Sequence, residues 1–223
     1  MGIEQSKIKY FPNSAEAIFD TAAECSGAMG NVGFPEGFRV MFAGNIGAAQ
    51  DFKTILSAAE LLKEHRNIHW MIVGDGRMFP WVREQVQIRE LEETVHLLGR
   101  HPLASMPAFY ARADVMLVIL KKEPVFAKTI PGKVQSCLAC SRPIIAALDG
   151  EGARVVEEAG AGLTCPAEDP ESLAKAVLKV SSMTADDRKK MGLQGRVYYE
   201  NNFESHMLLD RLDGWLSELA GRK

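Results

Sequence analysis

The chain contains 223 residues, of which 47% are hydrophobic and 25% are charged, and its formal net charge is −3. This is the composition of a globular chain with enough apolar side chains for a sizeable core. The weak negative charge provides no basic field for nucleic acid, and no apolar run approaches the roughly 20 residues that span a bilayer. The cysteines at positions 25, 137, 140 and 165 suit reduced thiols in a cytoplasmic protein.

The first 37 residues do not follow the pattern of the remaining chain. Residues 8–13 could form one strand and residues 14–20 a short helix, whereas residues 22–36 are rich in Gly, Ala and Ser and are typical of a loop. A sheet domain rarely begins in this way. We therefore expect residues 1–37 to be the remnant of an interdomain segment or linker.

From residue 38 onward, short apolar runs alternate with amphipathic stretches. A continuously apolar run predicts a strand with helices on both faces, and six strands are expected, at 39–44, 69–74, 94–99, 113–120, 143–148 and 162–165. Helices are expected at 51–65, 78–89 and 105–112, near residue 132, and at 170–180, 186–200 and 206–219. Strand–helix alternation with right-handed crossovers predicts an α/β fold, a doubly wound parallel sheet of Rossmann-like type with C-terminal helices.

Three expected strands end at glycine, namely Gly44, Gly74 and Gly99, where a tight turn leads into the next element. Ligands of open α/β sheets bind outside the carboxyl ends of the strands, so these exits are the candidate site. The glycines of the 44–47 loop would let a phosphate approach the backbone closely; alternatively, they only turn a strand into a helix. The 74–76 turn lacks the third glycine of a dinucleotide fingerprint, so turn geometry is its default explanation.

Two cations lie close to these exits. Arg100 follows the third strand and either holds a phosphate in a bidentate fork or pairs with a surface carboxylate. Lys133 is the strongest single candidate, because it lies in a turn of Pro131 and Gly132 that opens a helix. The dipole and the N–H groups of that first helical turn attract phosphate. A solvated charge is the alternative for Lys133.

The sequence contains no evident nucleophile, proton-transfer set or metal site. Cys137 and Cys140 have the spacing of metal ligands, but no second pair or histidine-rich partner accompanies them, so core packing explains them better. The five histidines form no HExxH group, and neither a GxSxG elbow nor a P-loop is present. The pattern therefore predicts phosphate binding.

The order of these motifs resembles the carboxyl-terminal half of family 4 glycosyltransferases, which have two facing Rossmann-like domains, the GT-B fold. The resemblance covers about residues 8–203. It rests on Phe-Pro-Asn at 11–13, the strand at 40–44, the glycine-rich exit at 71–76, the Gly-Arg exit at 95–100, the Tyr-to-Asp stretch at 110–114, and Leu-Ala-Cys-Ser-Arg-Pro-Ile-Ile-Ala at 138–146. Each motif alone is weak, whereas six in order at the family's spacing are specific.

The sequence departs from the family's pattern at four positions. Asn45 and Gln50 stand where most members carry an arginine and a lysine that grip the donor diphosphate. Lys128 and Ser136 stand where most members carry two glutamates, the second of which holds the donor ribose. These departures imply either an inactive site or a site that uses different cations.

The second possibility is favoured by a Ser/Thr-x-Pro-x-Lys turn, formed here by Thr129, Pro131 and Lys133. This turn is similar to that of a subgroup with fucosaminyl and other amino-sugar transferases of surface polysaccharide synthesis. The resemblance implies a retaining enzyme whose donor substrate is a nucleotide diphosphate sugar, commonly UDP-linked, with no metal or cofactor. It implies donor and phosphate binding by Gly44, Asn45, Gly47, Arg100, Thr129, Pro131, Gly132, Lys133 and Ser136, and nucleobase binding by Gly99, Arg100 and His101.

The resemblance also implies a domain organisation. Residues 38–204 would form the donor-binding domain, and residues 205–223 a helix that packs on the enzyme's own N-terminal acceptor domain. That domain would supply the catalytic residue, so none is assigned here and the isolated chain is expected to be inactive. The exposed face could dimerise. The enzyme is expected to be cytoplasmic and to use a saccharide or lipid-linked acceptor; an acceptor on a polyprenyl diphosphate carrier would place the complete enzyme at the inner membrane face.

Two other functions stay open at this point. The chain could be a non-catalytic Rossmann-like module that binds a nucleotide or a protein, which the substitutions at Asn45, Gln50 and Ser136 would permit. It could also belong to a sugar-nucleotide 2-epimerase of the same two-domain fold. The epimerase requires acid and base residues that the sequence does not show.

Overall fold

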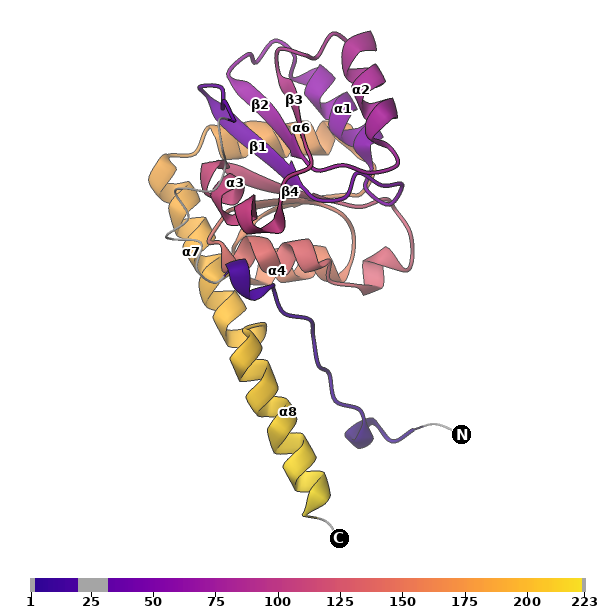
Figure 1. The fold of residues 1–223 in the computed structure, drawn as a ribbon, viewed down its shortest axis with the longest axis vertical. Helices are drawn as coiled ribbons and strands as arrows, with labels where there is room; N and C mark the ends of the chain where they lie inside the picture. Colours follow the sequence, from indigo (N-terminus) through magenta and orange to yellow (C-terminus); the bar gives the residue numbers. More distant parts are fainter. Residues whose placement is uncertain (1–2, 20–31, 222–223) are drawn as a thin grey trace.

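A computed structural model describes residues 3–19 and 32–221 of the chain (Figure 1). Within these residues lies a six-stranded parallel sheet with the strand order β3-β2-β1-β4-β5-β6. Its strands are β1 (Phe38–Ala43), β2 (Ile68–Val73), β3 (Val95–Gly99), β4 (Val115–Ile119), β5 (Ile144–Ala147) and β6 (Gly162–Cys165). The predicted fold class is confirmed, and all six predicted strands are present.

Two layers of helices cover the sheet. One face carries α1 (Phe52–Leu61), α2 (Phe79–Ile88) and α6 (Pro170–Ser181), and the other carries α3 (Met106–Arg112), α4 (Gly132–Ala139), α5 (Glu151–Glu158) and α7 (Ala185–Asn202). The central strands β2, β1, β4 and β5 are therefore buried almost throughout, which explains their continuously apolar sequences. Short 3-10 helices lie in the connections: η1 (Gln5–Lys7), η2 (Ala17–Phe19), η4 (Leu103–Ser105) and η5 (Phe126–Lys128).

Three expectations from the sequence differ from this structure. Residues 8–13 form no strand, because no sheet edge pairs with them among the described residues, and Ile8 and Tyr10 are 61% and 68% exposed. Only η2 forms in place of the helix expected at 14–20. The sequence pattern does not reveal α5, whose short apolar face buries just Val155 and Val156 as large side chains. The expected 22–36 loop and Cys25 fall largely outside the described residues.

The last helix, α8 (Ser205–Ala220), confirms the helix expected at 206–219 and projects away from the sheet (Figure 1). Within the described residues of α8, only Leu208 is buried. Leu209, Leu216 and Leu219 are each more than half exposed. The ring of Phe11 meets the ring of Trp215 edge-on, with centroids 6.4 Å apart. Across residues 3–19 and 32–221, no helix has both the length and the apolar character needed to cross a membrane.

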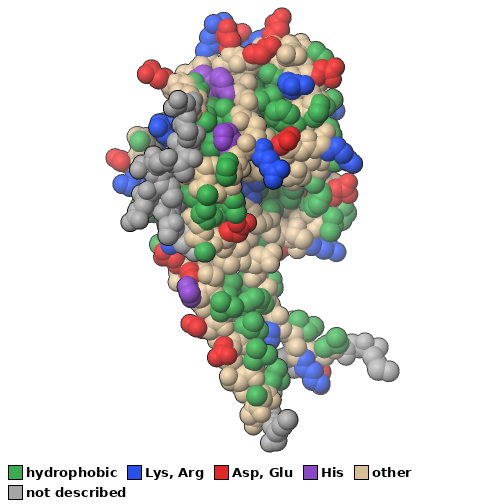
Figure 2. Space-filling view, in the orientation of Figure 1, with side chains coloured by type: hydrophobic (Ala, Val, Ile, Leu, Met, Phe, Trp, Pro, Cys, Tyr) green, Lys and Arg blue, Asp and Glu red, His purple; other side chains and the backbone are tan. Residues whose placement is uncertain are grey.

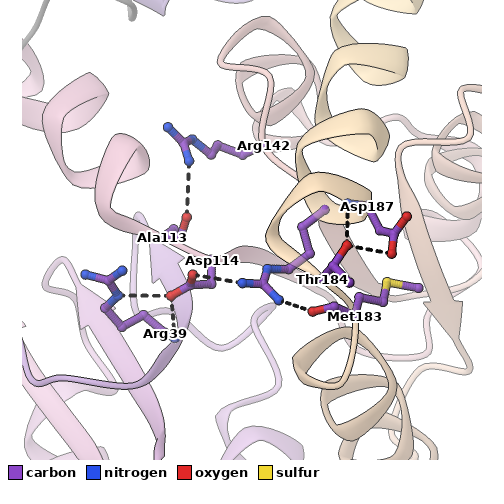
Figure 3. A network of polar contacts seen from close by, with 8 residues as sticks. Arg39, Ala113, Asp114, Arg142, Met183, Thr184 and Asp187 are labelled. Atoms are coloured by element: carbon purple, nitrogen blue, oxygen red, sulfur yellow. Dashed lines mark hydrogen bonds and ion pairs between the residues drawn. The ribbon is translucent and has the colours of Figure 1, made fainter.

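A polar network joins α7 to the amino-terminal edge of the sheet (Figure 3). One carboxylate oxygen of Asp114 accepts hydrogen bonds from the backbone N–H and the Nε of Arg39, both at 3.0 Å. Its other oxygen lies 3.6 Å from Arg188 of α7. Arg188 also donates to the carbonyl oxygen of Met183 at 2.5 Å. These contacts fix the first turn of α7 against the starts of β1 and β4.

The turn between α4 and β5 holds α7 at a second point. A Cβ added to Gly192 would stand 2.1 Å from the carbonyl oxygen of Ser141, so only glycine allows this close approach. We expect Gly192→Ala to destabilise the fold by roughly 1–3 kcal/mol through overpacking. Gly214 of α8 is a matched control, because its added Cβ would meet no atom within 4 Å.

Gly214→Ala should instead leave the free energy of unfolding unchanged or raise it by about 0.5–1 kcal/mol, since alanine favours the helix. Urea unfolding followed by circular dichroism compares the two variants. Equal unfolding midpoints would contradict the tight packing of α7 on the sheet domain.

Candidate functional site

The carboxyl-terminal edge of the sheet contains a cavity of about 530 Å³. Its walls come from the loops that follow the first three strands in the chain. The lining residues are Gly44, Asn45, Val73, Gly74, Asp75, Gly76, Arg100, His101, Leu103 and Met106. The structure therefore brings together four of the predicted site residues, Gly44, Asn45, Arg100 and His101, from strand exits that lie far apart in sequence.

Backbone hydrogen bonds join these strand exits to one another. The N–H of Ile46 donates to the carbonyl of Asp75 at 2.9 Å, and the N–H of Gly74 donates to the carbonyl of Gly99 at 2.7 Å. At Gly74, where φ is +137°, an added Cβ would stand 1.9 Å from the carbonyl oxygen of Gly44. A side chain at position 74 would therefore force the first two exits apart. The loops form a preorganised wall rather than separate flexible turns.

The side-chain amides of Asn45 and Gln50 are used inside the first loop. Gln50 Oε1 accepts a hydrogen bond from the N–H of Gly47 at 3.2 Å. The Asn45 side chain lies against two glycines. A Cβ added to Gly47 would be 2.5 Å from Asn45 Nδ2, and a Cβ added to Gly76 would be 2.6 Å from Asn45 Oδ1. The Gln50 amide thus stabilises the loop's own conformation, and the Asn45 amide occupies the space between the two glycines. The N–H of Gly47 is thus engaged, and Gly47 lines a neighbouring cavity rather than this one.

That neighbouring cavity, of about 730 Å³, contains a carboxylate at the start of α1. Asp51 is 6% exposed and accepts a hydrogen bond from the hydroxyl of Thr54. A negative charge already interacts with the positive end of the α1 dipole, so this helix start does not favour phosphate. One acidic residue before a helix is usually a cap, so the sequence alone does not mark Asp51. The start of α4, at the same edge of the sheet, carries no such carboxylate.

Lys133 lies in the first turn of α4, and its side chain extends beneath the end of β1. Its Nζ is 3.5 Å from the ring centroid of Phe42, which gives a cation–π contact. A Cβ added to Gly44 would meet the same Nζ at 3.1 Å. The amine therefore points to the first strand exit, next to the cavity that Gly44 lines. This inward direction is not the solvated charge that the sequence left as an alternative.

The electrostatic environment of Lys133 lacks a compensating charge. No ion pair joins it to any described residue. The residue is half-buried, and burial lowers the pKa of its amine from the ordinary 10.5 to about 7, a shift that the neighbouring Cys137 thiol opposes. Removal from water disfavours the charged form when no anion is present. An anion at the β1 exit would restore the proton to this amine.

The remaining predicted residues have local roles in the structure. The hydroxyl of Thr129 donates to the carbonyl of Phe126 at 3.0 Å, and the hydroxyl of Ser136 donates to the carbonyl of Gly132 at 3.2 Å. Pro131 is the N-cap of α4, which has no side-chain cap. The N-terminal N–H groups of α4 that have no helical partner thus donate no hydrogen bond to a cap side chain, which is the condition that a phosphate site there would require.

The β3 exit, at Gly99 to His101, is fixed by its backbone conformation and by contacts of the His101 ring. Gly99 has φ of +72°, a conformation that glycine adopts without strain. The Nε2 of His101 lies 3.1 Å from the carbonyl oxygen of Leu98, and its ring packs on Phe109 with centroids 4.6 Å apart. Arg100 between them is exposed and has no ion pair with a described residue. The predicted nucleobase role of these residues stays a prediction.

One polar group near α4 was missed by the sequence analysis. Gln135 is 1% exposed, and its Nε2 donates to the carbonyl of Asn13 at 2.6 Å. Its Oε1 has no hydrogen-bond partner. Gln135 thus ties residues 8–13 to the sheet domain, a contact over 122 residues that no local pattern predicts. Cys137 on the same helix is a buried thiol, as the core-packing interpretation expected.

A family model described as glycosyl transferases group 1 matches residues 37–182. Over 172 residues the chain is 30% identical to the probable glycosyltransferase WbjE of Pseudomonas aeruginosa, covering 76% of this chain and 42% of that protein. It is 22% identical to the amylovoran biosynthesis glycosyltransferase AmsK of Erwinia amylovora, covering 82% of this chain and 45% of that protein. The chain therefore spans less than half the length of the curated relatives it matches.

Solved structures share the fold. A glycosyltransferase from Rickettsia africae ESF-5 superimposes with a TM-score of 0.79 at 16% identity, covering 99% of this chain and 59% of that one. Anabaena Alr3699/HepE in complex with UDP and glucose gives a TM-score of 0.70 at 15% identity, covering 82% of this chain and 49% of that one. At these identities the likeness shows the fold alone.

The lowered pKa of the Lys133 amine predicts how the free energy of unfolding depends on pH. The amine titrates near pH 7 in the folded chain and near its ordinary 10.5 in the unfolded chain. The unfolded state thus binds more protons between these values, so the free energy of unfolding rises with pH across this window. Lys133→Met lacks that dependence. We expect the variant to melt about 3 °C or more above the wild type at pH 7 and below.

The difference in melting temperature between Lys133→Met and the wild type should shrink through pH 9. It should vanish above about pH 10.5, where the Lys133 amine is uncharged in both the folded and the unfolded wild type. Calorimetry of both proteins across the pH range measures it. Lys190→Met, at an exposed position of α7, is the control and should shift the melting temperature little at any pH. A pH-independent difference for Lys133→Met would rule out the buried amine as its cause.

Proposed function

The chain belongs to the glycosyl transferases group 1 family, and from this premise we propose that it is the donor-binding domain of a retaining glycosyltransferase. The complete enzyme would transfer a hexosyl or amino-sugar group from a nucleotide diphosphate sugar to a saccharide or lipid-linked acceptor. The nucleotide would lie at the carboxyl-terminal edge of the sheet. Its diphosphate would meet Lys133 at the start of α4, and its base would meet the β3 exit.

One observation carries this proposal: two cations without an anionic partner flank a cavity formed by three strand exits. Lys133 directs its amine to Gly44, and Arg100 lines the cavity from the opposite exit. A nucleoside diphosphate brings two to three negative charges to such a site. Each charge-assisted hydrogen bond that forms is stronger than a neutral one. The lining itself contains one cation, Arg100, and one carboxylate, Asp75, so the adjacent Lys133 amine is the group that favours a diphosphate.

The geometry suggests how the domain would assist transfer. In the reaction, the bond between the sugar C1 and the β-phosphate oxygen breaks, and the acceptor oxygen bonds to C1 and releases its proton. The leaving nucleotide gains negative charge as this bond breaks. Lys133, Arg100 and the N-terminal N–H groups of α4 would stabilise that charge, which is the step where preorganised donors contribute most. That the reaction needs neither metal nor cofactor stays a prediction.

Two features support a second domain in the complete protein. The family's curated relatives are more than twice as long as the matched region, and α8 presents the exposed leucines 209, 216 and 219 beside the Phe11–Trp215 contact. We propose that residues 1–37 and 205–223 belong to the region between the domains, with 38–204 as the donor domain. An acceptor domain would cover these side chains and supply the catalytic residue. Without it, the chain could pair with a second copy through the same surface.

The identity of donor and acceptor rests on weaker support. UDP is the proposed nucleotide, because the structurally similar HepE is described in complex with UDP and glucose. The Thr129, Pro131 and Lys133 turn favours an amino sugar through its similarity to the fucosaminyl subgroup. A lipid-linked acceptor would place the enzyme on the cytoplasmic side of the inner membrane. These assignments are the parts of the proposal that binding assays should test first.

A binding module without catalysis is the second candidate function. It is favoured by Asn45 and Gln50, whose amides stabilise the first loop instead of presenting cations to a ligand. The two candidates differ in nucleotide affinity. A module for protein partners would bind no nucleotide, whereas the donor domain should bind UDP.

Titration calorimetry with UDP tests the proposal directly. We expect UDP to bind this chain, and Lys133→Ala to weaken binding at least about tenfold, because one charge-assisted contact is lost. Lys190→Ala, remote from the cavity on α7, should bind like the wild type. In the complete enzyme Lys133→Ala should lower the transfer rate roughly 10²-fold or more.

The chain alone should bind the donor but transfer no sugar, which a radiolabelled-sugar assay measures. Unchanged UDP affinity or unchanged turnover in Lys133→Ala would remove Lys133 from the site. No heat with UDP, GDP or their sugars would favour the binding-module function.

A further inference from the structure

A second polar cavity lies at the opposite, amino-terminal edge of the sheet. Its volume is about 590 Å³, and its walls are the start of β4, the turn between α4 and β5, and the first turns of α7. Four cationic side chains line it, and its lining contains a single carboxylate, that of Asp114. The cations are Arg142, Arg188, Lys189 and Arg196. The donor-binding function proposed above makes no use of this cavity.

Asp114 cannot compensate this charge, because its two oxygens are already occupied. One accepts two hydrogen bonds from Arg39 (Figure 3), and the other pairs with Arg188. Arg188 itself also bonds the carbonyl of Met183. Among the acidic residues at the start of α7, Asp187 accepts from the hydroxyl of Thr184. Asp186 and Asp187 are exposed and do not line the cavity.

Arg142 is the side chain whose bonding is incomplete. Its Nη1 donates to the carbonyl of Ala113 over a long 3.4 Å (Figure 3). Its Nε is buried and has no hydrogen-bond partner. Burial lowers the pKa of this guanidinium, and the Arg39 charge acts in the same direction, although Cys140 and Asp114 oppose it. The guanidinium thus lies on the cavity wall with one long hydrogen bond to a described residue, and its other terminal N–H groups can bind an anion.

Lys189 adds a second uncompensated charge at the mouth of the cavity. It is exposed, and no ion pair connects it to a described residue. Ala185, the first residue of α7, lies on the same wall, but Thr184 caps that helix and its first turn carries Asp186 and Asp187, so its dipole is not counted toward anion binding. The guanidinium fork of Arg142 and the ammonium group of Lys189 together favour a tetrahedral oxyanion.

We propose that this amino-edge cavity binds a phosphate-bearing anion distinct from the donor nucleotide, held mainly by Arg142 and Lys189. The phosphate would accept hydrogen bonds from the terminal N–H groups of the Arg142 guanidinium and from the Lys189 ammonium group. Two sources share this chemistry, a soluble phosphate compound and the head group of an anionic phospholipid. A phospholipid would bring the amino edge of the sheet to a membrane surface, whereas a soluble phosphate would act as a regulator or as a stabilising ion.

Titration with inorganic phosphate tests the cavity, with chloride at equal ionic strength as the reference. The readouts are the melting temperature and the ¹H–¹⁵N signal of Arg142 Nε. We expect a saturable response to phosphate but not to chloride. Arg142→Gln should weaken phosphate binding about tenfold, the value of one charge-assisted hydrogen bond. Lys189→Gln should weaken it about threefold, as an exposed charge contributes less.

Lys190→Gln is the matched control, because Lys190 is the next residue of α7 and does not line this cavity. It should bind phosphate like the wild type. In Lys133→Met the Arg142 Nε signal should respond to phosphate as in the wild type, which separates this cavity from the donor site. If Arg142→Gln fails to fold, the phosphate affinities of Lys189→Gln and Lys190→Gln are compared instead, and a weaker affinity for Lys189→Gln alone supports the proposal.

A second arm uses vesicles of phosphatidylcholine with or without phosphatidylglycerol. A lipid head group is the source if the protein sediments with the anionic vesicles and if Arg142→Gln or Lys189→Gln reduces that sedimentation. Lys190→Gln should leave the sedimentation unchanged. A phosphate response without vesicle binding identifies a soluble anion. The proposal is overturned if phosphate acts no differently from chloride, or if Lys189→Gln and Lys190→Gln behave alike in both arms.

Discussion

The candidate site depends on one contact: the amine of Lys133 lies against the face of Phe42, at the end of the central strand β1, with no carboxylate to pair with. Such an arrangement is unfavourable in the absence of an anion, because burial removes water from the amine and supplies only a ring face in return. A fold that retains it holds a cation ready at a fixed position. A diphosphate that reaches this position gains a charge-assisted bond without reorganising the protein.

The rest of the sheet edge keeps that position fixed. Gly44 leaves the space that the amine occupies, and Gly74 allows the first two strand exits to touch. Gln50 accepts a hydrogen bond from the N–H of Gly47 within the first loop. The buried carboxylate of Asp51 makes the start of α1 unfavourable for phosphate. The proposed anion position is therefore at α4 and the β3 exit, where Lys133 and Arg100 have no ion pair with a described residue.

The sequence predicts the scaffold better than the site. Continuously apolar strands and the glycines at three exits are local signals, so the sheet and its carboxyl edge could be placed correctly. The orientation of Lys133 and the partner of Gln135 depend on segments distant in the chain, and no spacing reveals them. The bond between Gln50 and the N–H of Gly47 is local, but the sequence alone does not distinguish it from a side chain that faces a ligand. The strand expected at 8–13 illustrates the same limit, since an apolar run becomes a strand only where a sheet edge is available to pair with it. The helix α5 is amphipathic but has only eight residues and two large buried side chains, so it is easily overlooked.

The two edges of the sheet thus differ in how they use positive charge. At the carboxyl edge the proposed donor site has the half-buried amine of Lys133 and the exposed guanidinium of Arg100, whereas at the amino edge Arg142 and Lys189 remain after Asp114 is satisfied. The most direct test of the account is NMR titration of the ¹³Cε signal of Lys133 with and without UDP. The account predicts a pKa of about 7 for the unliganded chain, rising above about 9 when the diphosphate binds. A Lys133 amine that titrates at its ordinary value without ligand, or that titrates identically with UDP present, would contradict it.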